Sequence, residues 1–435
     1  MRDLLLAFIV FGSLPFVLKR PFIGVLVLAW LGYMNPHKLG WGFMVTAPVV
    51  QIVTLVTLVG MLVSKEAKRM VWSREVIILV IFIFWMGITT TQALFYGLAV
   101  EQYAKVIKIQ ILTFMTLIVL TSREKIHLFV WVVVVSLGFY GIKGGIFTVA
   151  HGGEYRIWGP ANTFIGGNNE LALALVMTIP LMRYLHLQET NKWLKLGLAG
   201  AMPLTAICAV GSQSRGALVA LLLTGGIFWL KSRGKFLSFI FMLIAGVVVV
   251  SLMPDAYWER MNTIKTYDED GSALGRINAW WTAFYVAKAQ FFGGGFEMFQ
   301  SEIFQIYAPD PERVHDVHSI YFEVLGEHGF VGLFLFLGLL LLTWLKCSAT
   351  IRLGSKNPAH TWARDLASMI QVSLVAYMVG GAFLGLAYFD YLYHLIALAV
   401  VVHQLALVLP DKRPAVQVAA EPISSIGRSR HELKP

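Results

Sequence analysis

A polar segment, residues 313–332, holds most of the side chains in this sequence that could carry out chemistry. It reads Arg-Val-His-Asp-Val-His-Ser-Ile-Tyr-Phe-Glu-Val-Leu-Gly-Glu-His-Gly-Phe-Val-Gly and leads directly into an apolar stretch. Ionisable side chains are costly at a membrane boundary and commonly mark a functional site. We therefore expect the reaction centre here, acting on a substrate held at the lipid surface. The ionisable residues concerned are His315, Asp316, His318, Glu323, Glu327 and His328.

His318 is the candidate general base or acid, because an imidazole with a pKa near about 6.5 transfers protons readily at neutral pH. Asp316, Glu323 or Glu327 could orient its ring. Nine residues of regular helix place Glu327 roughly on the face opposite His318. A direct pair between the two side chains would therefore need a break in the helix, which we expect at Gly326. His318 could instead be an interfacial histidine with a carboxylate partner and no catalytic role.

The spacing His315-x-x-His318, with Glu312 and Asp316 nearby, leaves a metal site open. The segment lacks the tight ligand pattern of zinc-binding helices, and we predict no metal and no cofactor.

Two arginines stand where short turns lead into apolar stretches. Arg215 lies in Gly-Ser-Gln-Ser-Arg-Gly, and Arg156 lies in Tyr-Arg-Ile-Trp-Gly ahead of Asn168 and Asn169. A helix N-terminus with serine caps and an arginine fork has the parts of an anion site. Arg276 adds a third cation on the same side of the chain. Such cations suit a pyrophosphate, although each arginine could also extend to the interface or pair with a carboxylate.

Composition indicates the class of protein. Hydrophobic residues make up 57% of the 435 residues and charged residues 14%, which describes a polytopic α-helical membrane protein. The positive residues gather in alternate connections, so the net charge of +10 reflects topology, and no nucleic-acid partner is expected. Spans are predicted near 43–63, 76–97, 106–120, 127–150, 168–186, 195–210, 216–231, 235–253, 329–346, 367–388 and 391–409.

The first thirty-four residues form either one broken crossing or a tight hairpin around Lys19-Arg20-Pro21, which brings the total to about twelve spans. The cation-rich connections should face the cytoplasm. Residues 254–328 then form one large outward loop, in which 273–288 has the periodicity of an interfacial helix and Gly293-Gly-Gly295 ends it.

The motifs together resemble the O-antigen ligase and polymerase superfamily. His318-Ser, followed by Glu327-His-Gly329-Phe-Val-Gly332, is similar to its signature at the end of the large periplasmic loop, with Ser where the family often has Asn. The Arg156 segment is similar to its R-x2-G motif, and Ser214-Arg215-Gly216 to its S-R-G motif. The short N-terminal pieces also resemble putative O-glycosylation ligases associated with exosortases.

The resemblance implies an all-α protein of a bacterial inner membrane, with its active site facing the periplasm. Its expected parts are N-terminal transmembrane helices (1–253), a large periplasmic loop containing helices and the catalytic segment (254–328), C-terminal transmembrane helices (329–409) and a cytoplasmic tail (410–435).

The implied activity belongs to lipopolysaccharide biosynthesis. A glycan moves from undecaprenyl pyrophosphate to lipid A-core with inversion, without a metal, and membrane lipid surrounds the enzyme. The implied catalytic residues are His318, Arg215 and Arg276. Trp280, Trp281 and Tyr285 would stack on sugars or anchor the loop in the membrane. The implied residues for pyrophosphate and glycan binding are Arg156, Asn168, Asn169, His315 and Glu327.

Three other activities remain open on the sequence. A polymerase and a protein O-glycosylation ligase would use the same donor with another acceptor. A transporter is the third alternative, because about twelve spans with ionisable residues are also typical of secondary carriers. Here the charges cluster at one face, which favours transfer chemistry over transport.

Overall fold

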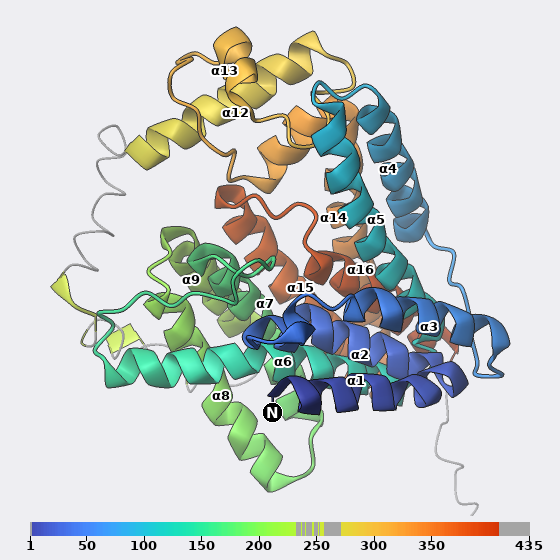
Figure 1. Ribbon diagram of the computed structural model, residues 1–435. Coiled ribbons are helices and arrows are strands. Elements are labelled where there is room, and N and C mark those ends of the chain that lie inside the picture. Colours follow the sequence, from blue (N-terminus) through green and yellow to red (C-terminus); the bar gives the residue numbers. More distant parts are fainter. Residues whose placement is uncertain are drawn as a thin grey trace, which may run out of the picture.

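The computed structural model describes residues 2–231 and 271–408, together with a few isolated positions between them. Every regular element within these ranges is helical. Figure 1 shows the helices packed into one body, with α12 and α13 above the upper end of α14. The helices are α1 (Arg2–Lys19), α2 (Pro21–Tyr33), α3 (Val49–Val63), α4 (Arg74–Thr91), α5 (Tyr96–Val119), α6 (Arg123–Ala150), α7 (Asn168–Gln188), α8 (Lys192–Gly211), α9 (Arg215–Lys231), α12 (Gly271–Ala289), α13 (Ser301–Tyr307), α14 (Ile320–Lys356), α15 (Thr361–Gly380) and α16 (Asp390–Val408), with short 3-10 turns at Pro36–Leu39, Phe43–Val45, Pro358–His360 and Gly381–Phe383.

Eight helical segments in the described ranges are long and apolar enough to cross a membrane, and α2, α3 and most of α9 are shorter apolar helices. The chain is thus a multi-pass membrane protein. Each predicted span within these ranges overlaps a helix, whereas 235–253 lies outside the described residues. The predicted total of about twelve spans is not confirmed.

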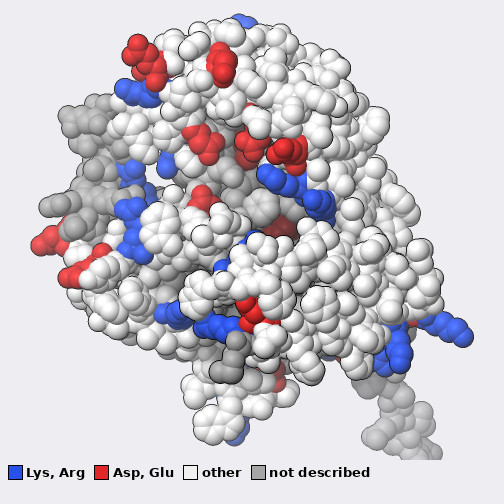
Figure 2. Space-filling view, viewed as in Figure 1, with Lys and Arg blue, Asp and Glu red and all other residues white. Residues whose placement is uncertain are grey.

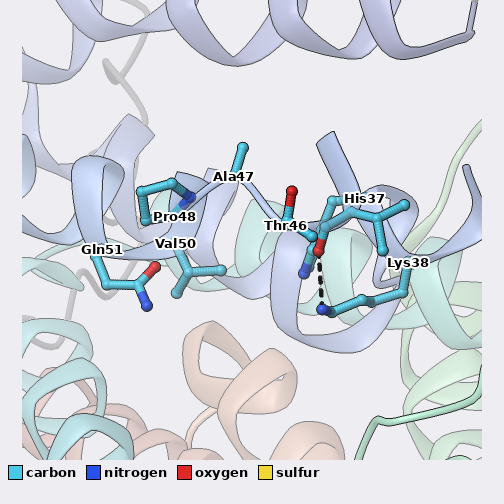
Figure 3. A pocket seen from close by; sticks show the side chains of 8 residues that line it. His37, Lys38, Thr46, Ala47, Pro48, Val50 and Gln51 are labelled. Atoms are coloured by element: carbon cyan, nitrogen blue, oxygen red, sulfur yellow. Dashed lines mark hydrogen bonds between the residues drawn. The ribbon is translucent and has the colours of Figure 1, made fainter. Parts of the chain in front are cut away.

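The first thirty-four residues form two helices that break at Arg20 and Pro21, as the hairpin alternative predicts. The chain after α2 returns to the start of α1, where the Asp3 carboxylate lies against the backbone of Gly40 and Gly42. A cavity of about 460 Å³ opens in the connection that follows, lined by residues between His37 and Gln51 (Figure 3).

Polar contacts join the cation-rich connections at one end of the bundle. Because these connections are far apart in sequence, their contacts support the predicted grouping of positive residues on one side. The contacts are Lys125–Glu66 (2.9 Å), Lys346–Glu75 (3.3 Å), Arg123–Gln188 (3.2 Å) and Gln188–Asp365 (3.1 Å).

The helix predicted over 273–288 is confirmed as α12. It is followed by a turn in which Gly293 and Gly295 have φ angles of 73° and 77°, a region that glycine adopts without steric cost. The turn is paired to α14 through hydrogen bonds from the N–H groups of Gly294 and Gly295 to the carbonyls of Gly326 and Glu327. The glycines therefore end α12, as predicted, and also bind the turn to the segment of α14 that contains Gly326 and Glu327.

Candidate functional site

The loop that carries His318 is held from above by α12. The Asn278 side chain donates to the carbonyls of Asp310 and Arg313 and accepts from the N–H of Asp310. Trp280 Nε1 donates to the carbonyl of Val317 at 2.8 Å. These contacts fix the backbone immediately before His318 to a regular helix. A side chain on a loop held in this way keeps a well-defined position.

Trp280 has a structural role in addition to the expected one in sugar stacking or membrane anchoring, which stays a prediction. Its ring is stacked on Phe322 with centroids 5.1 Å apart, and its N–H is used by Val317. Trp281 is 48% exposed and stacks on Tyr285, so these two rings remain available to a membrane or a glycan. The sequence pattern could not separate two adjacent tryptophans that point to different sides of one helix.

We expect Trp280→Phe to loosen the His318 loop, because phenylalanine keeps a ring against Phe322 but loses the donor to Val317. The lost hydrogen bond should cost about 1 kcal/mol of stability. A lower kcat should accompany it, measured with the transfer assay described below alongside thermal unfolding in detergent. Trp281→Phe is the matched control, and an equal loss of kcat in that variant would contradict this role of Trp280.

His318 has a φ of 39°, an uncommon backbone conformation for a residue with a side chain. Its Nδ1 lies 3.5 Å from Oδ2 of Asp316, and its ring lies 5.4 Å from that of His315. Burial lowers the pKa of His318, the Asp316 carboxylate acts in the opposite direction, and Arg276 and His315 lower it further. The ring is therefore set up to be neutral, with Asp316 facing one nitrogen.

No direct pair forms between His318 and Glu327, and the predicted break at Gly326 is wrong. Gly326 lies inside α14, whereas Gly329 has φ 66° and ψ −172°, which interrupt the helix. In the part of α14 ahead of this kink, the Glu327 side chain contacts Tyr388 and the backbone of Glu297 instead of His318. The kink coincides with the predicted start of the membrane span at 329.

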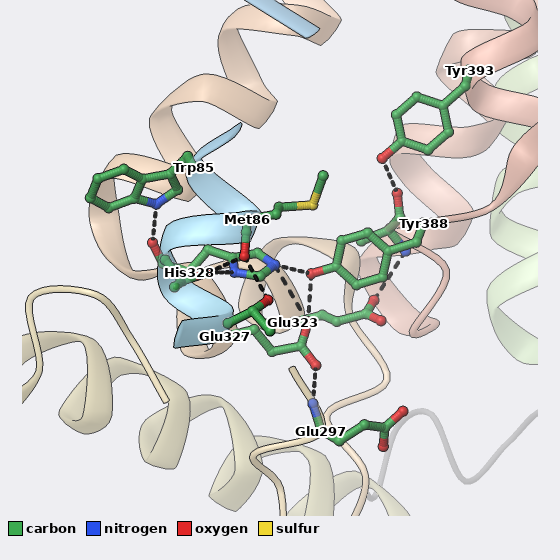
Figure 4. Close-up of polar contacts among 11 residues, drawn as sticks. Trp85, Met86, Glu297, Glu323, Glu327, His328, Tyr388 and Tyr393 are labelled. Atoms are coloured by element: carbon green, nitrogen blue, oxygen red, sulfur yellow. Dashed lines mark hydrogen bonds and ion pairs between the residues drawn. The ribbon is translucent and has the colours of Figure 1, made fainter. Parts of the chain in front are cut away.

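Glu327 belongs to a buried polar network, shown in Figure 4. One carboxylate oxygen accepts from the Tyr388 hydroxyl at 2.5 Å, and the other accepts from the N–H of Glu297 at 2.9 Å. The same hydroxyl lies 2.8 Å from His328 Nε2, and His328 Nδ1 lies 2.7 Å from the Thr89 hydroxyl. Buried polar groups that satisfy one another in this way fix a single side-chain arrangement.

The two turns that carry Arg156 and Arg215 pack on one another. The N–H of Ile157 donates to the carbonyl of Gly211, and the Gln213 side chain donates to the carbonyl of Gly153. Ser214 caps α9 by accepting from the N–H of Ala217, as the sequence predicts. These contacts bring together the two turns that carry the arginines, although the turns are far apart in sequence.

The start of α7 connects these turns to the His318 loop. Asn168 is buried and donates to the carbonyl of Ser212 at 2.9 Å. Two residues later, Glu170 interacts electrostatically with both Asp316 and Arg276. The start of α7 thus contacts the Arg215 turn, and its Glu170 lies within electrostatic range of Asp316 and Arg276.

Arg156 has the features of an anion-binding residue. Its guanidinium lies 5.8 Å from the ring centre of Trp158, and its buried Nε has no hydrogen-bond partner within residues 2–231 and 271–408. A buried donor without a partner costs free energy unless a ligand satisfies it. Asn169 makes one long contact to the Asn168 side chain, at 3.5 Å.

A cavity of about 430 Å³ lies beside the His318 loop. Figure 2 shows acidic side chains around a hollow on this face of the molecule, with basic side chains at its flanks. His315, Asp316 and Glu327 all line this cavity, although Glu327 makes no direct contact with His318. Its lining residues are Gln102, Glu297, Phe299, Gln300, Val314, His315, Asp316, Val317, Glu323, Glu327 and Gly385.

The described residues contain no group of three or more His, Cys, Asp and Glu side chains arranged to hold a metal, including around His315 and His318. Sequence reasoning missed two participants. Tyr388 is sixty-one residues from Glu327 and carries no motif. Glu170 follows the Asn168-Asn169 pair directly, but only the fold shows its proximity to Arg276.

Two family models match the chain. Residues 1–190 match a family of unknown function, DUF5935, and residues 200–337 match the family described as O-antigen ligase. No curated protein matches. The second match contains Arg215, Arg276 and His318 in the arrangement described above. Over residues 200–337, about a third of its length, this chain is similar to the O-antigen ligase family.

Proposed function

We propose that the protein is an O-antigen ligase that moves a glycan from undecaprenyl pyrophosphate to lipid A-core, with inversion and without a metal, at the periplasmic face of a bacterial inner membrane. The observation that carries this proposal is the contact of His318 with Asp316, under the electrostatic influence of Arg276, beside a polar cavity and within the segment that matches the O-antigen ligase family.

In the proposed reaction the acceptor hydroxyl oxygen forms a bond to the anomeric carbon while the bond from that carbon to the pyrophosphate breaks. His318 takes the hydroxyl proton. Its Nδ1 faces Asp316, which leaves Nε2 for the acceptor. The additional negative charge that develops on the leaving pyrophosphate, as its oxygen takes the electron pair of the broken bond, would be stabilised by Arg156, Arg215 and Arg276.

The arginines and the carboxylates divide the site into two chemically different halves. Arg156, Arg215 and the end of α7 make a cationic half suited to a pyrophosphate. The cavity lined by Asp316 and Glu323 makes an acidic half. This division supports a reaction between an anionic donor and a separate acceptor, with His318 next to the acidic half through Asp316.

The test is transfer by the purified protein in liposomes. Undecaprenyl-pyrophosphate glycan is supplied with EDTA and one acceptor at a time: lipid A-core, a second molecule of the lipid-linked glycan, or an acceptor polypeptide. Glycosylated lipid A-core is the expected product. Longer chains on the polyprenyl carrier would identify a polymerase, glycosylated polypeptide would identify a protein ligase, and no product with any acceptor would refute transferase function.

The pH profile should report His318. Because its pKa is lowered, the ring stays neutral and able to accept a proton below its ordinary value of about 6.5, so the acid limb of kcat/KM should lie below that pH. Asp316 opposes this shift, and Asp316→Asn should therefore move the limb to still lower pH. The profile of Glu302→Gln, an exposed carboxylate on α13, should match that of the unmodified protein. A limb that rises in Asp316→Asn would contradict the assignment.

A further inference from the structure

Carboxyl groups make up most of the ionisable lining of the cavity beside His318. Four carboxylates reach it from separate parts of the chain: Asp316 from the loop, Glu323 and Glu327 from α14, and Glu297 from the turn after α12. No lysine or arginine is among the described residues that line it. Burial and like charges raise the pKa of Glu323 and Glu327, which leaves Asp316 and Glu297 to oppose a negatively charged ligand.

Glu327 is fully hydrogen-bonded within the protein, whereas Glu323 keeps one carboxyl oxygen that a ligand could use. Both oxygens of Glu327 accept hydrogen bonds, from Tyr388 and from the N–H of Glu297. Glu323 accepts from the N–H of Ala387 through Oε2 only. Its other oxygen has no hydrogen-bond partner within residues 2–231 and 271–408. Glu327 thus fixes the wall of the cavity, and Glu323 offers a lone pair to its interior.

The backbone at Glu297 is also unusual for an ordinary loop residue. It has a φ of 58°, and its N–H is held by the buried Glu327 carboxylate. A non-glycine residue in this region is uncommon and tends to occur at functional sites. The anchored N–H maintains this conformation, while the Glu297 side chain remains among the groups that line the cavity.

We propose that this cavity is the acceptor subsite and that it selects an acceptor sugar that is neutral or carries an amine, and rejects one that carries a phosphate or a carboxylate. Sugar hydroxyls and ammonium groups donate hydrogen bonds to carboxylates, and such charge-assisted bonds are strong. An anionic sugar would place another negative charge beside Glu297 and Asp316, which is discrimination through repulsion.

The position of the cavity gives this selection a role in the reaction. His315 and Asp316 line the cavity, and Asp316 also contacts the ring of His318. A sugar held there has its hydroxyls next to the base that we assign to the reaction. Phe299 and the side-chain amides of Gln102 and Gln300 complete the lining with an apolar surface and neutral polar groups, which are typical of sugar-binding sites.

This inference rests on the proposed function, and its test separates the two. Purified protein in liposomes receives one donor and four acceptors that differ only in the terminal sugar: a neutral hexose, a hexosamine, a hexose phosphate and a uronic acid. We expect kcat/KM for the two anionic acceptors to be at least about tenfold lower than for the neutral one. The hexosamine should be used as well as the hexose or better.

The variants test whether these carboxylates cause the selection. In Glu297→Gln, Asp316→Asn and the double variant, the amide oxygen still accepts hydrogen bonds but the charge is lost. The neutral-to-anionic ratio of kcat/KM should fall about tenfold in the double variant, because the repulsion is removed. Glu302→Gln, which removes an exposed carboxylate outside the cavity, should leave the ratio unchanged.

Each outcome is decisive. Equal use of neutral and anionic acceptors, or a ratio that stays constant in the double variant while its thermal unfolding is unchanged, would overturn the proposed selectivity and leave the transferase function standing. Absence of transfer to every acceptor by the unmodified protein would instead refute the proposed function.

Discussion

Replacing His318 by alanine is expected to lower kcat by a factor of about 100 to 10,000, the usual contribution of a positioned general base. The KM for the donor should change only slightly, because the groups that we assign to the pyrophosphate are the arginines. The variant should fold normally, since His318 lies in a loop whose backbone is held by Asn278 and Trp280. Initial rates at saturating donor, with thermal unfolding alongside, measure both effects.

The matched control is His151→Ala. His151 is an exposed histidine that follows α6 and stacks on Phe147, so its loss should leave kcat within about twofold, as for most surface substitutions. If His318→Ala retained more than a tenth of the activity at every pH, the residue would not be the base, and the kinetic role would have to pass to a neighbouring group.

Gly329→Ala is expected to damage both stability and activity. An added Cβ would lie 2.5 Å from the carbonyl oxygen of Phe291, and the backbone with φ 66° and ψ −172° is essentially restricted to glycine. Strain of about 1–3 kcal/mol adds to the clash with backbone atoms. Relief requires the kink to open, which would displace Glu327 and His328 from Tyr388. A lower melting temperature in detergent should accompany near-complete loss of transfer.

Gly338→Ala provides the control on the same helix. There a Cβ would meet only Ile78 Cδ1, at 3.8 Å, an ordinary contact. Alanine in a helix interior is more stable than glycine by about 0.5–1 kcal/mol, so this variant should unfold at the same or a higher temperature. Equal melting temperatures for the two variants would show that the kink is not needed for stability.

The helices were predictable from the sequence because hydropathy is a local signal, and the spans near 127–150 and 391–409 match α6 and α16 closely. The arginine turns were predictable because serine caps and glycines mark where α9 begins. The position of the break at Gly329 was not, because it depends on the approach of Phe291 and Gly293, which lie more than thirty residues away.

The same limit applies to the side chains of the site. Nothing in the sequence around Tyr388 marks it as a partner of Glu327. The sequence alone also does not distinguish the two adjacent tryptophans of α12. Their different roles arise from tertiary contacts, to Val317 and Phe322 for Trp280 and to Tyr285 for Trp281. Sequence identified which residue types could react, and the fold determined which of them meet.

The network around Glu327 has a consequence for the modularity of the chain. Thr89 lies in the segment matched by the family of unknown function, Glu327 and His328 lie in the segment matched as O-antigen ligase, and Tyr388 lies beyond both. Three stretches of sequence therefore complete one buried cluster. A chimera that exchanged only the ligase segment would inherit the acid and the imidazole without the hydroxyls that match them here, so all three stretches would have to be exchanged together.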